Sequence, residues 1–129
     1  MKTYQQKNEF TIPKSAYYRT IYLIKDLPRL LEEADAIIGA TPPETETPEI
    51  QRQRNLRATE TQNLKYAAIM ADIRDIQNAI IEAVPPDKRM AIMENILDGK
   101  AYPIDCDRRT YGRYKQKLVY ILATKRHYI

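Results

Sequence analysis

A run of evenly spaced apolar residues that ends at Pro85 constrains the fold more than any other feature of the sequence. Its apolar positions recur in alternating steps of three and four residues: Tyr66, Ile69, Ile73, Ile76, Ile80 and Ala83. This period is that of an α-helix with one narrow buried face. Pro85 and Pro86 end the pattern, because proline cannot continue a helix. We therefore predict a helix over residues 59–84, whose seam packs against another helix either within the chain or across a dimer.

The segment before this helix is polar and rich in proline. Thr59 and Gln62 have the spacing of a capping box, which places the helix start near residue 59. Residues 41–48 (TPPETETP) contain three prolines, so we expect residues 41–50 to be irregular. Residues 50–58 either extend the predicted helix or belong to the linker. They contain three basic residues: Arg52, Arg54 and Arg57.

A first helical region is predicted at about residues 14–39. An apolar stripe at helical spacing runs along it: Tyr17, Ile21, Ile24, Leu31, Ala34 and Ile38. Pro28 either kinks this helix or follows the start of a second one, with Asp26 as a favourable N-cap. Gly39 is a natural C-terminal stop.

A third helix is predicted over residues 87–98, with Pro86 in its first turn and Gly99 as its stop. Asp87 lies favourably near the positive end of the helix dipole. We expect four apolar residues to form the buried face of this helix: Met90, Met93, Ile96 and Leu97.

The last predicted helix spans residues 107–125, with Asp107 as its N-cap. Its apolar side chains fall on one side at helical spacing: Tyr111, Tyr114, Leu118, Ile121 and Leu122. The expected fold is therefore all-α, a small helical bundle. We expect an N-terminal helical region at 1–40, a linker at 41–58 and a helical core at 59–129 that includes the C-terminal helix.

Composition supports this fold class and narrows the function. Only three glycines occur, which favours helices over a turn-rich β-sandwich. No apolar stretch approaches the roughly 20 residues that cross a bilayer, and residues 1–10 lack the apolar centre of a signal peptide, so we expect a cytoplasmic protein with no membrane partner. With one cysteine, Cys106, and one histidine, His127, we expect no disulfide, metal or other cofactor.

Positive charge is concentrated near the C-terminus. From Lys100 onward there are eight Lys or Arg residues against Asp105 and Asp107, a net charge of +6. Because the whole chain has a net charge of +4, residues 1–99 have a net charge of −2. Such a distribution is typical of nucleic-acid binding. The same pattern also fits a solvated helix face, or attraction to RNA or acidic lipid without specificity.

The charged residues elsewhere do not indicate an enzyme. Glu32, Glu33 and Asp35 cluster on a helix that is otherwise structural, and Asp72 and Asp75 lie on the polar side of the Ile-rich helix. Such carboxylates are more often solvated surface than acid–base or metal sites. The sequence contains neither a glycine-rich phosphate loop nor a nucleophile–base signature. We expect a protein without enzymatic activity.

The last helix is the candidate functional segment. Arg109, Arg113 and Lys117 are separated by four-residue steps, so they project from one helical face, opposite the apolar one. A helix in the DNA major groove needs such cations for phosphates and forked donors for base edges. Amides in the first turn of the helix could also contact a phosphate. The candidate DNA-binding residues are Arg108, Arg109, Thr110, Arg113, Gln116 and Lys117.

The stretch CDRRTYGRY at 106–114, continuing into LVYILA at 118–123, resembles the recognition helix of RinA/ArpU-type phage transcription regulators. The resemblance implies a helix-turn-helix similar to region 4 of bacterial sigma factors, with Asp107 in place of the family's capping Ser and Thr110 at its Thr. The sequence VPPDK at 84–88 is similar to the entry of the helix that precedes the family's motif. Residue-level resemblance covers about the last 45 positions.

The chain departs from the family at one place. The family has a full helix between the entry helix and the recognition helix, whereas residues 99–105 (GKAYPID) leave room for little more than a turn. The helix-turn-helix is therefore expected to be shortened.

Three functions are compatible with these features. The first is a sequence-specific transcription regulator of a prophage or related mobile element, which binds double-stranded DNA as a homo-dimer or higher homo-oligomer and could contact RNA polymerase. The second is a small phage DNA-packaging protein similar to a terminase small subunit. The third is a regulator that binds a protein and does not touch DNA. Salt-dependent DNA affinity would separate the first two from the third.

Overall fold

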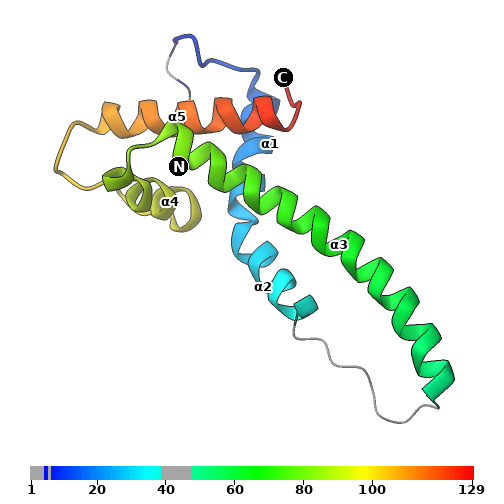
Figure 1. Cartoon of the computed structure of the whole chain (residues 1–129). Helices are drawn as coiled ribbons and strands as arrows, with labels where there is room; N and C mark the ends of the chain where they lie inside the picture. The colour runs from blue at the N-terminus through cyan, green and yellow to red at the C-terminus, as the bar shows by residue number, and fades with distance from the viewer. Residues whose placement is uncertain (1–4, 6, 39–47) are drawn as a thin grey trace. The chain divides into compact units, whose positions relative to one another are not determined.

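The computed structural model describes residues 5, 7–38 and 48–129, and for residues 48 and 50–59 it describes the backbone only. This part of the chain is helical and contains no strands (Figure 1). The all-α prediction is confirmed. In chain order the helices are α1 (Lys14–Lys25), α2 (Leu27–Ile38), α3 (Pro48–Ala83), the short 3-10 helix η1 (Pro86–Lys88), α4 (Arg89–Asp98) and α5 (Arg108–Lys125).

The chain divides into two compact units. Unit 1 combines Met1–Leu27 with Asp75–Ile129, and unit 2 is Pro28–Arg74, so α3 contributes to both. These boundaries do not coincide with the expected ones after residues 40 and 58, because the long helix α3 runs without a break through position 58.

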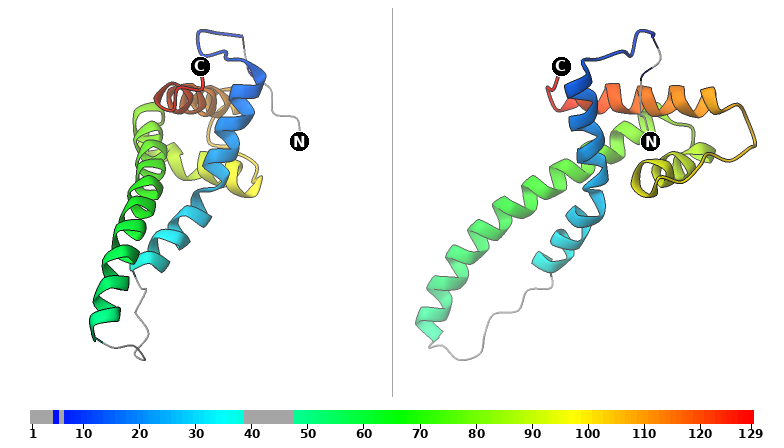
Figure 2. Two further views of the ribbon diagram at one scale, coloured as in Figure 1. Left: turned by 90° about the vertical axis from the view of Figure 1, so that its right-hand side faces the viewer. Right: turned by 180° about the vertical axis from the view of Figure 1, so that it is seen from behind.

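Unit 1 is built around α5. Helix α1 packs against both α5 and α4, and α4 packs against α5 (Figure 2). One core cluster joins the start of the chain to the C-terminal half of α5: Ile12, Ala16, Tyr17, Ile21, Val119 and Ala123. Three tyrosines, Tyr18, Tyr120 and Tyr128, cover its edge. The N-terminal and C-terminal segments therefore form one folding unit.

The first helical region is two helices, and Asp26 is the C-cap of the first. The Asp26 amide donates to Tyr22 and Leu23 carbonyls, and α2 begins at the next residue. The break shifts the helical phase, so Leu30 and Ala34 are buried in α2. Leu31 and Ile38, two members of the predicted stripe, are exposed. Gly39 lies outside the described residues.

Helix α3 begins earlier than predicted. Its first residue is Pro48, a favourable position for proline at a helix start. Thr59 is therefore inside the helix, and the capping-box prediction is wrong. Residues 48–50 are helical rather than irregular, while 41–47 lie outside the described residues. Five of the six residues of the predicted apolar seam are buried within a single chain, namely Ile69, Ile73, Ile76, Ile80 and Ala83, whereas Tyr66 is half-buried. Burial of these five does not require a dimer partner.

Helix α4 has a different buried face from the predicted one. Ile92, Asn95 and Ile96 are buried, whereas Met90 is 74% exposed. Of the other predicted residues, Ile96 is buried and Met93 and Leu97 are half-buried. The first turn of the predicted helix is the separate helix η1. The stop at Gly99 is confirmed: its φ of 67° is left-handed, and its amide donates to the Asn95 carbonyl.

Helix α5 matches its prediction closely. It spans Arg108–Lys125, and the Asp107 carboxylate accepts a hydrogen bond of 2.9 Å from the Arg109 amide, as an N-cap does. At the other end the Tyr128 amide donates to the Ala123 carbonyl while His127 is left-handed, the pattern of a Schellman motif. Both ends of the helix are thus firmly terminated. No helix among the described residues combines the length and apolarity needed to cross a membrane.

Candidate nucleic-acid interface

Helix α5 is buried over more of its circumference than an amphipathic surface helix. Its buried residues are Tyr111, Gln116, Leu118, Val119, Leu122 and Ala123. Leu118 and Leu122 belong to the predicted apolar side, whereas Val119 and Ala123 pack on α1 and the segment before it. Tyr114 and Ile121 of the predicted apolar side are half-buried. Packing from two directions leaves only a strip of the helix open to solvent.

Three cations occupy that strip. Arg109 and Arg113 are exposed and Lys117 is half-exposed. Four-residue steps advance by about 40° around a helix, so the three side chains follow one gently winding row. Within the described chain, none of these side chains has an ion pair, a hydrogen bond or an aromatic contact. The structure therefore agrees with the predicted cationic face at these positions.

Most other cations of unit 1 have partners. Four of these cations form salt bridges: Lys88 with Asp87 and Asp105, Lys100 with Glu94, Lys125 with Glu82, and Arg126 with Asp75. Lys115 points inward and donates to the Asn95 side chain, and burial lowers its pKa, helped by nearby Lys25. The row on α5 differs from these because nothing in the described chain neutralises it.

Two of the remaining predicted residues lie at the start of the helix. Arg108 is exposed and lies close enough to Tyr102 to favour the ionised form of that phenol, although burial leaves the pKa of Tyr102 raised overall. Thr110 is half-buried. Both remain next to the row formed by Arg109 and Arg113.

Gln116 lies on the same side of α5 as Arg113, but it is not open to solvent. It is 3% exposed, and its Oε1 accepts a hydrogen bond of 3.0 Å from the Asn8 side chain. Gln116 therefore does not present its side chain to solvent beside the cationic row, and its contact with DNA stays a prediction. Helical periodicity could not show this, because the group that covers Gln116 comes from the other end of the chain.

The first turn of α5 has little capacity for a phosphate. The Asp107 carboxylate occupies the Arg109 amide, and the Thr110 amide donates to the Asp107 carbonyl at 3.0 Å. An acidic cap also repels an anion. Two of the amides expected to contact a phosphate, those of Arg109 and Thr110, are therefore already occupied.

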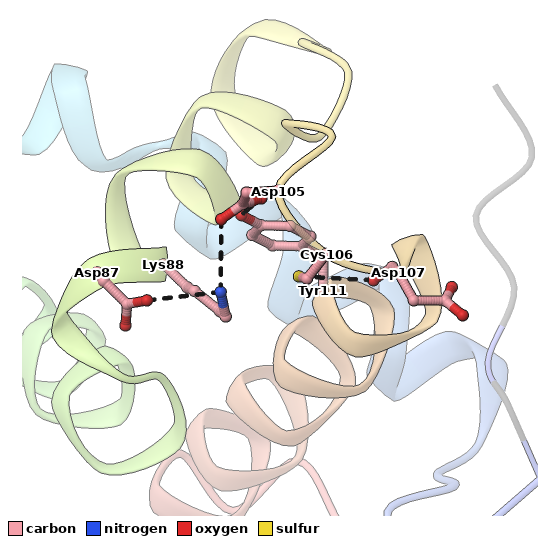
Figure 3. Close-up of polar contacts among 6 residues, drawn as sticks. All are labelled: Asp87, Lys88, Asp105, Cys106, Asp107 and Tyr111. Carbon is pink, nitrogen blue, oxygen red and sulfur yellow. Dashed lines mark hydrogen bonds and ion pairs between the residues drawn. The ribbon is translucent and has the colours of Figure 1, made fainter.

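A polar cluster fixes the start of α5 against η1 (Figure 3). The Tyr111 hydroxyl donates to Asp105 at 2.7 Å, and Lys88 lies 3.6 Å from the other oxygen of Asp105. The Lys88 ammonium also sits 5.2 Å from the centre of the Tyr111 ring, which stacks on the Tyr102 ring with the two centres 4.9 Å apart. These contacts orient the first turn of the cationic row.

The cluster shifts three ionisation equilibria. The hydrogen bond from Tyr111 lowers the pKa of Asp105, and the same bond raises the pKa of Tyr111 to about 12. Burial opposes the charged form of Lys88, but Cys106, Asp105 and Asp87 together raise its pKa. Near neutral pH the three pKa shifts favour an ionised Asp105, a neutral Tyr111 and a protonated Lys88.

Replacing Tyr111 with phenylalanine should reduce the free energy of unfolding only in a defined pH window. The stabilisation from Asp105 is present above its ordinary pKa of 3.8 and is lost as pH falls through the lower folded value. The stabilisation from Tyr111 is present below pH 10.0 and is lost as pH rises towards about 12. Urea unfolding of both proteins at pH 3, 7 and 11.5 measures this. An equal difference at all three pH values would contradict the assigned bond.

The connection between α4 and α5 is not that of a standard helix-turn-helix. It covers residues 99–107 and contains no helix, whereas the turn of a helix-turn-helix has about three or four residues. The predicted absence of a full helix at 99–105 is confirmed. Helix α5 therefore depends on α1, α4 and the polar cluster for its support.

Comparisons with known proteins add no identification. Scans against protein-family models, curated proteins and solved structures found no match to this chain. The resemblance to RinA/ArpU-type regulators stays a prediction from sequence. Within the described residues, no group of three or more His, Cys, Asp or Glu side chains could hold a metal ion.

Proposed function

We propose that this protein binds double-stranded DNA through the open strip of α5 and acts as a transcription regulator of a prophage or related mobile element. The observation that supports DNA binding is the row of Arg109, Arg113 and Lys117. These cations are left without partners in the described chain, on a helix that contains six basic and no acidic residues. A polyanion with regularly spaced charges is the partner that best fits such a row. The regulatory role rests on the sequence resemblance alone.

The geometry of the strip suggests a division of roles. Arg113 is exposed in the second turn and can present a paired donor to guanine, with Arg109 as the next candidate. Lys117 supplies a single compact charge suited to a phosphate oxygen. Arg108 and Thr110 border the row at the first turn and can add backbone contacts.

DNA binding is tested by an electrophoretic mobility assay with duplexes from the surrounding gene cluster at two salt concentrations. We expect the logarithm of affinity to fall with the logarithm of salt concentration, by about 0.9 for each neutralised phosphate. Absence of binding to any duplex at low salt would reject the proposal and favour a regulator that binds a protein, such as RNA polymerase.

DNase footprinting separates the two DNA-binding functions. Protection over a promoter supports the regulator, and protection over a packaging site supports a protein similar to a terminase small subunit. Self-association is a separate part of the proposal. Sedimentation at tens of micromolar tests it, and a monomer at that concentration would remove the dimer or higher oligomer.

A further inference from the structure

The N-terminal loop, defined here as Gln5 and residues 7–12, is closed by its own side chains. The Gln5 amide group both donates to the Ile12 carbonyl at 2.9 Å and accepts from the Ile12 amide at 3.0 Å. Inside the loop, the Asn8 side chain accepts from the Phe10 amide, and the Thr11 amide donates to the Asn8 carbonyl. This amount of local bonding gives the loop a defined shape.

The N-terminal loop docks on α5 beside the cationic row. Asn8 donates to Gln116, and the Phe10 ring meets Tyr120 edge-on at 5.4 Å. Gln116 and Tyr120 are one helical turn apart, and Arg113 lies one turn before Gln116 on the same side. In Figures 1 and 2 the loop runs along the side of α5 that faces away from α4. The loop thus borders the open strip.

Lys7 shares the property that distinguishes the row. Its side chain is exposed and has no ion pair, hydrogen bond or ring contact with any described residue. The other lysines near the N-terminus differ, because Lys14 lies over the Tyr18 ring and Lys25 over the Tyr22 ring. Lys7 directly precedes Asn8, so its backbone lies about one residue spacing (~3.8 Å) from the residue that holds Gln116.

We infer that the N-terminal loop is a second part of the DNA-binding surface, in which Lys7 contacts a phosphate beside the groove that receives α5. Asn8 and Gln116 are positioning residues, because their hydrogen bond fixes the residue after Lys7 on α5, one helical turn beyond Arg113. The inference rests on the proposed DNA binding. It also gives the buried Gln116 a role different from base contact.

The test compares DNA affinity and its salt dependence in full-length variants. Lys7→Ala should weaken binding about five- to tenfold at 0.1 M salt and lower the salt slope by about one. Lys25→Ala removes the same charge from the far end of α1 and should change neither quantity. Asn8→Ala should weaken DNA binding because it releases the N-terminal loop from α5. In the Asn8→Ala background, the further substitution Lys7→Ala should reduce DNA affinity by a smaller factor than it does in the wild-type protein. Thermal melts show whether each variant is folded.

The outcomes separate this inference from the proposed function. If Lys7→Ala binds like the wild type while loss of the α5 row abolishes binding, the inference fails and the function stands. If Asn8→Ala binds more tightly than the wild type, the loop obstructs α5 instead of assisting it, and the inference is overturned. If the wild type binds no duplex, both fail.

Discussion

Replacing Arg109, Arg113 and Lys117 together with alanine should weaken DNA binding by about 100-fold or more at 0.1 M salt and lower the salt slope by two to three units. The three side chains have no partners in the described chain, so their removal breaks no internal contact. The free energy of unfolding of the variant should therefore lie within about 0.5 kcal/mol of the wild-type value. Titration of a labelled duplex at several salt concentrations measures both effects.

A matched control removes three charges whose side chains have partners. Lys25 lies over the Tyr22 ring. Lys100 forms a salt bridge with Glu94, and Lys125 forms one with Glu82. Their triple alanine variant has the same net charge as the first one and should retain most of the affinity. Equal losses in the two variants would show that only net charge matters. Unchanged binding in the first variant would reject α5 as the DNA-binding helix, and Arg52, Arg54 and Arg57 would be tested next.

Single replacements within the row separate its roles. Lys117→Ala should weaken binding to all sequences alike and lower the salt slope by about one. Arg113→Ala should in addition cost about 1–3 kcal/mol against the preferred sequence and relax the preference at one base pair. Competition with duplexes mutated at single positions measures this difference. A uniform loss for Arg113→Ala would assign that side chain to a phosphate instead.

The helices could be predicted from sequence because their signals are local. The seam of α3 and the ends of α5 can be read from spacing, Pro85 and Asp107, and each has a counterpart in the structure. The errors occur where one helix turns into another. The break after Asp26 changes the helical phase, so Leu31 is exposed although its spacing indicated burial. Met90, at the start of α4 directly after η1, is also exposed.

The candidate site could be predicted only on the side that nothing covers. Arg109 and Arg113 are exposed and Lys117 is half-exposed, so these three side chains keep their predicted face. The burial of Gln116 depends on Asn8, at a distance of 108 residues in sequence, and no periodicity within α5 indicates that contact. The bonds of Asp105 with Tyr111 and Lys88 are likewise tertiary. Such contacts require the packed fold.

Replacing Leu118 with alanine should have the largest effect on stability, about 3 kcal/mol within a usual range of about 2–5. Leu118 is 0% exposed and lies in the middle of α5. The substitution removes buried methyl groups and leaves a cavity that the neighbouring helices can fill only in part. Ile104→Ala is the matched control, because Ile104 is fully exposed in the connection to the same helix. It should change stability by less than about 0.5 kcal/mol.

Urea unfolding of both variants tests whether α5 is supported as the structure shows. Similar stabilities for Leu118→Ala and Ile104→Ala would contradict the packing of α5 in unit 1. DNA binding of Leu118→Ala then separates support from contact. Well below its unfolding temperature, the variant should bind DNA nearly as tightly as the wild type, because the neighbouring Lys117 and the rest of the row are unchanged. As the temperature approaches unfolding, binding should be lost together with helical circular dichroism, since α5 can present its row only while the core of unit 1 holds it.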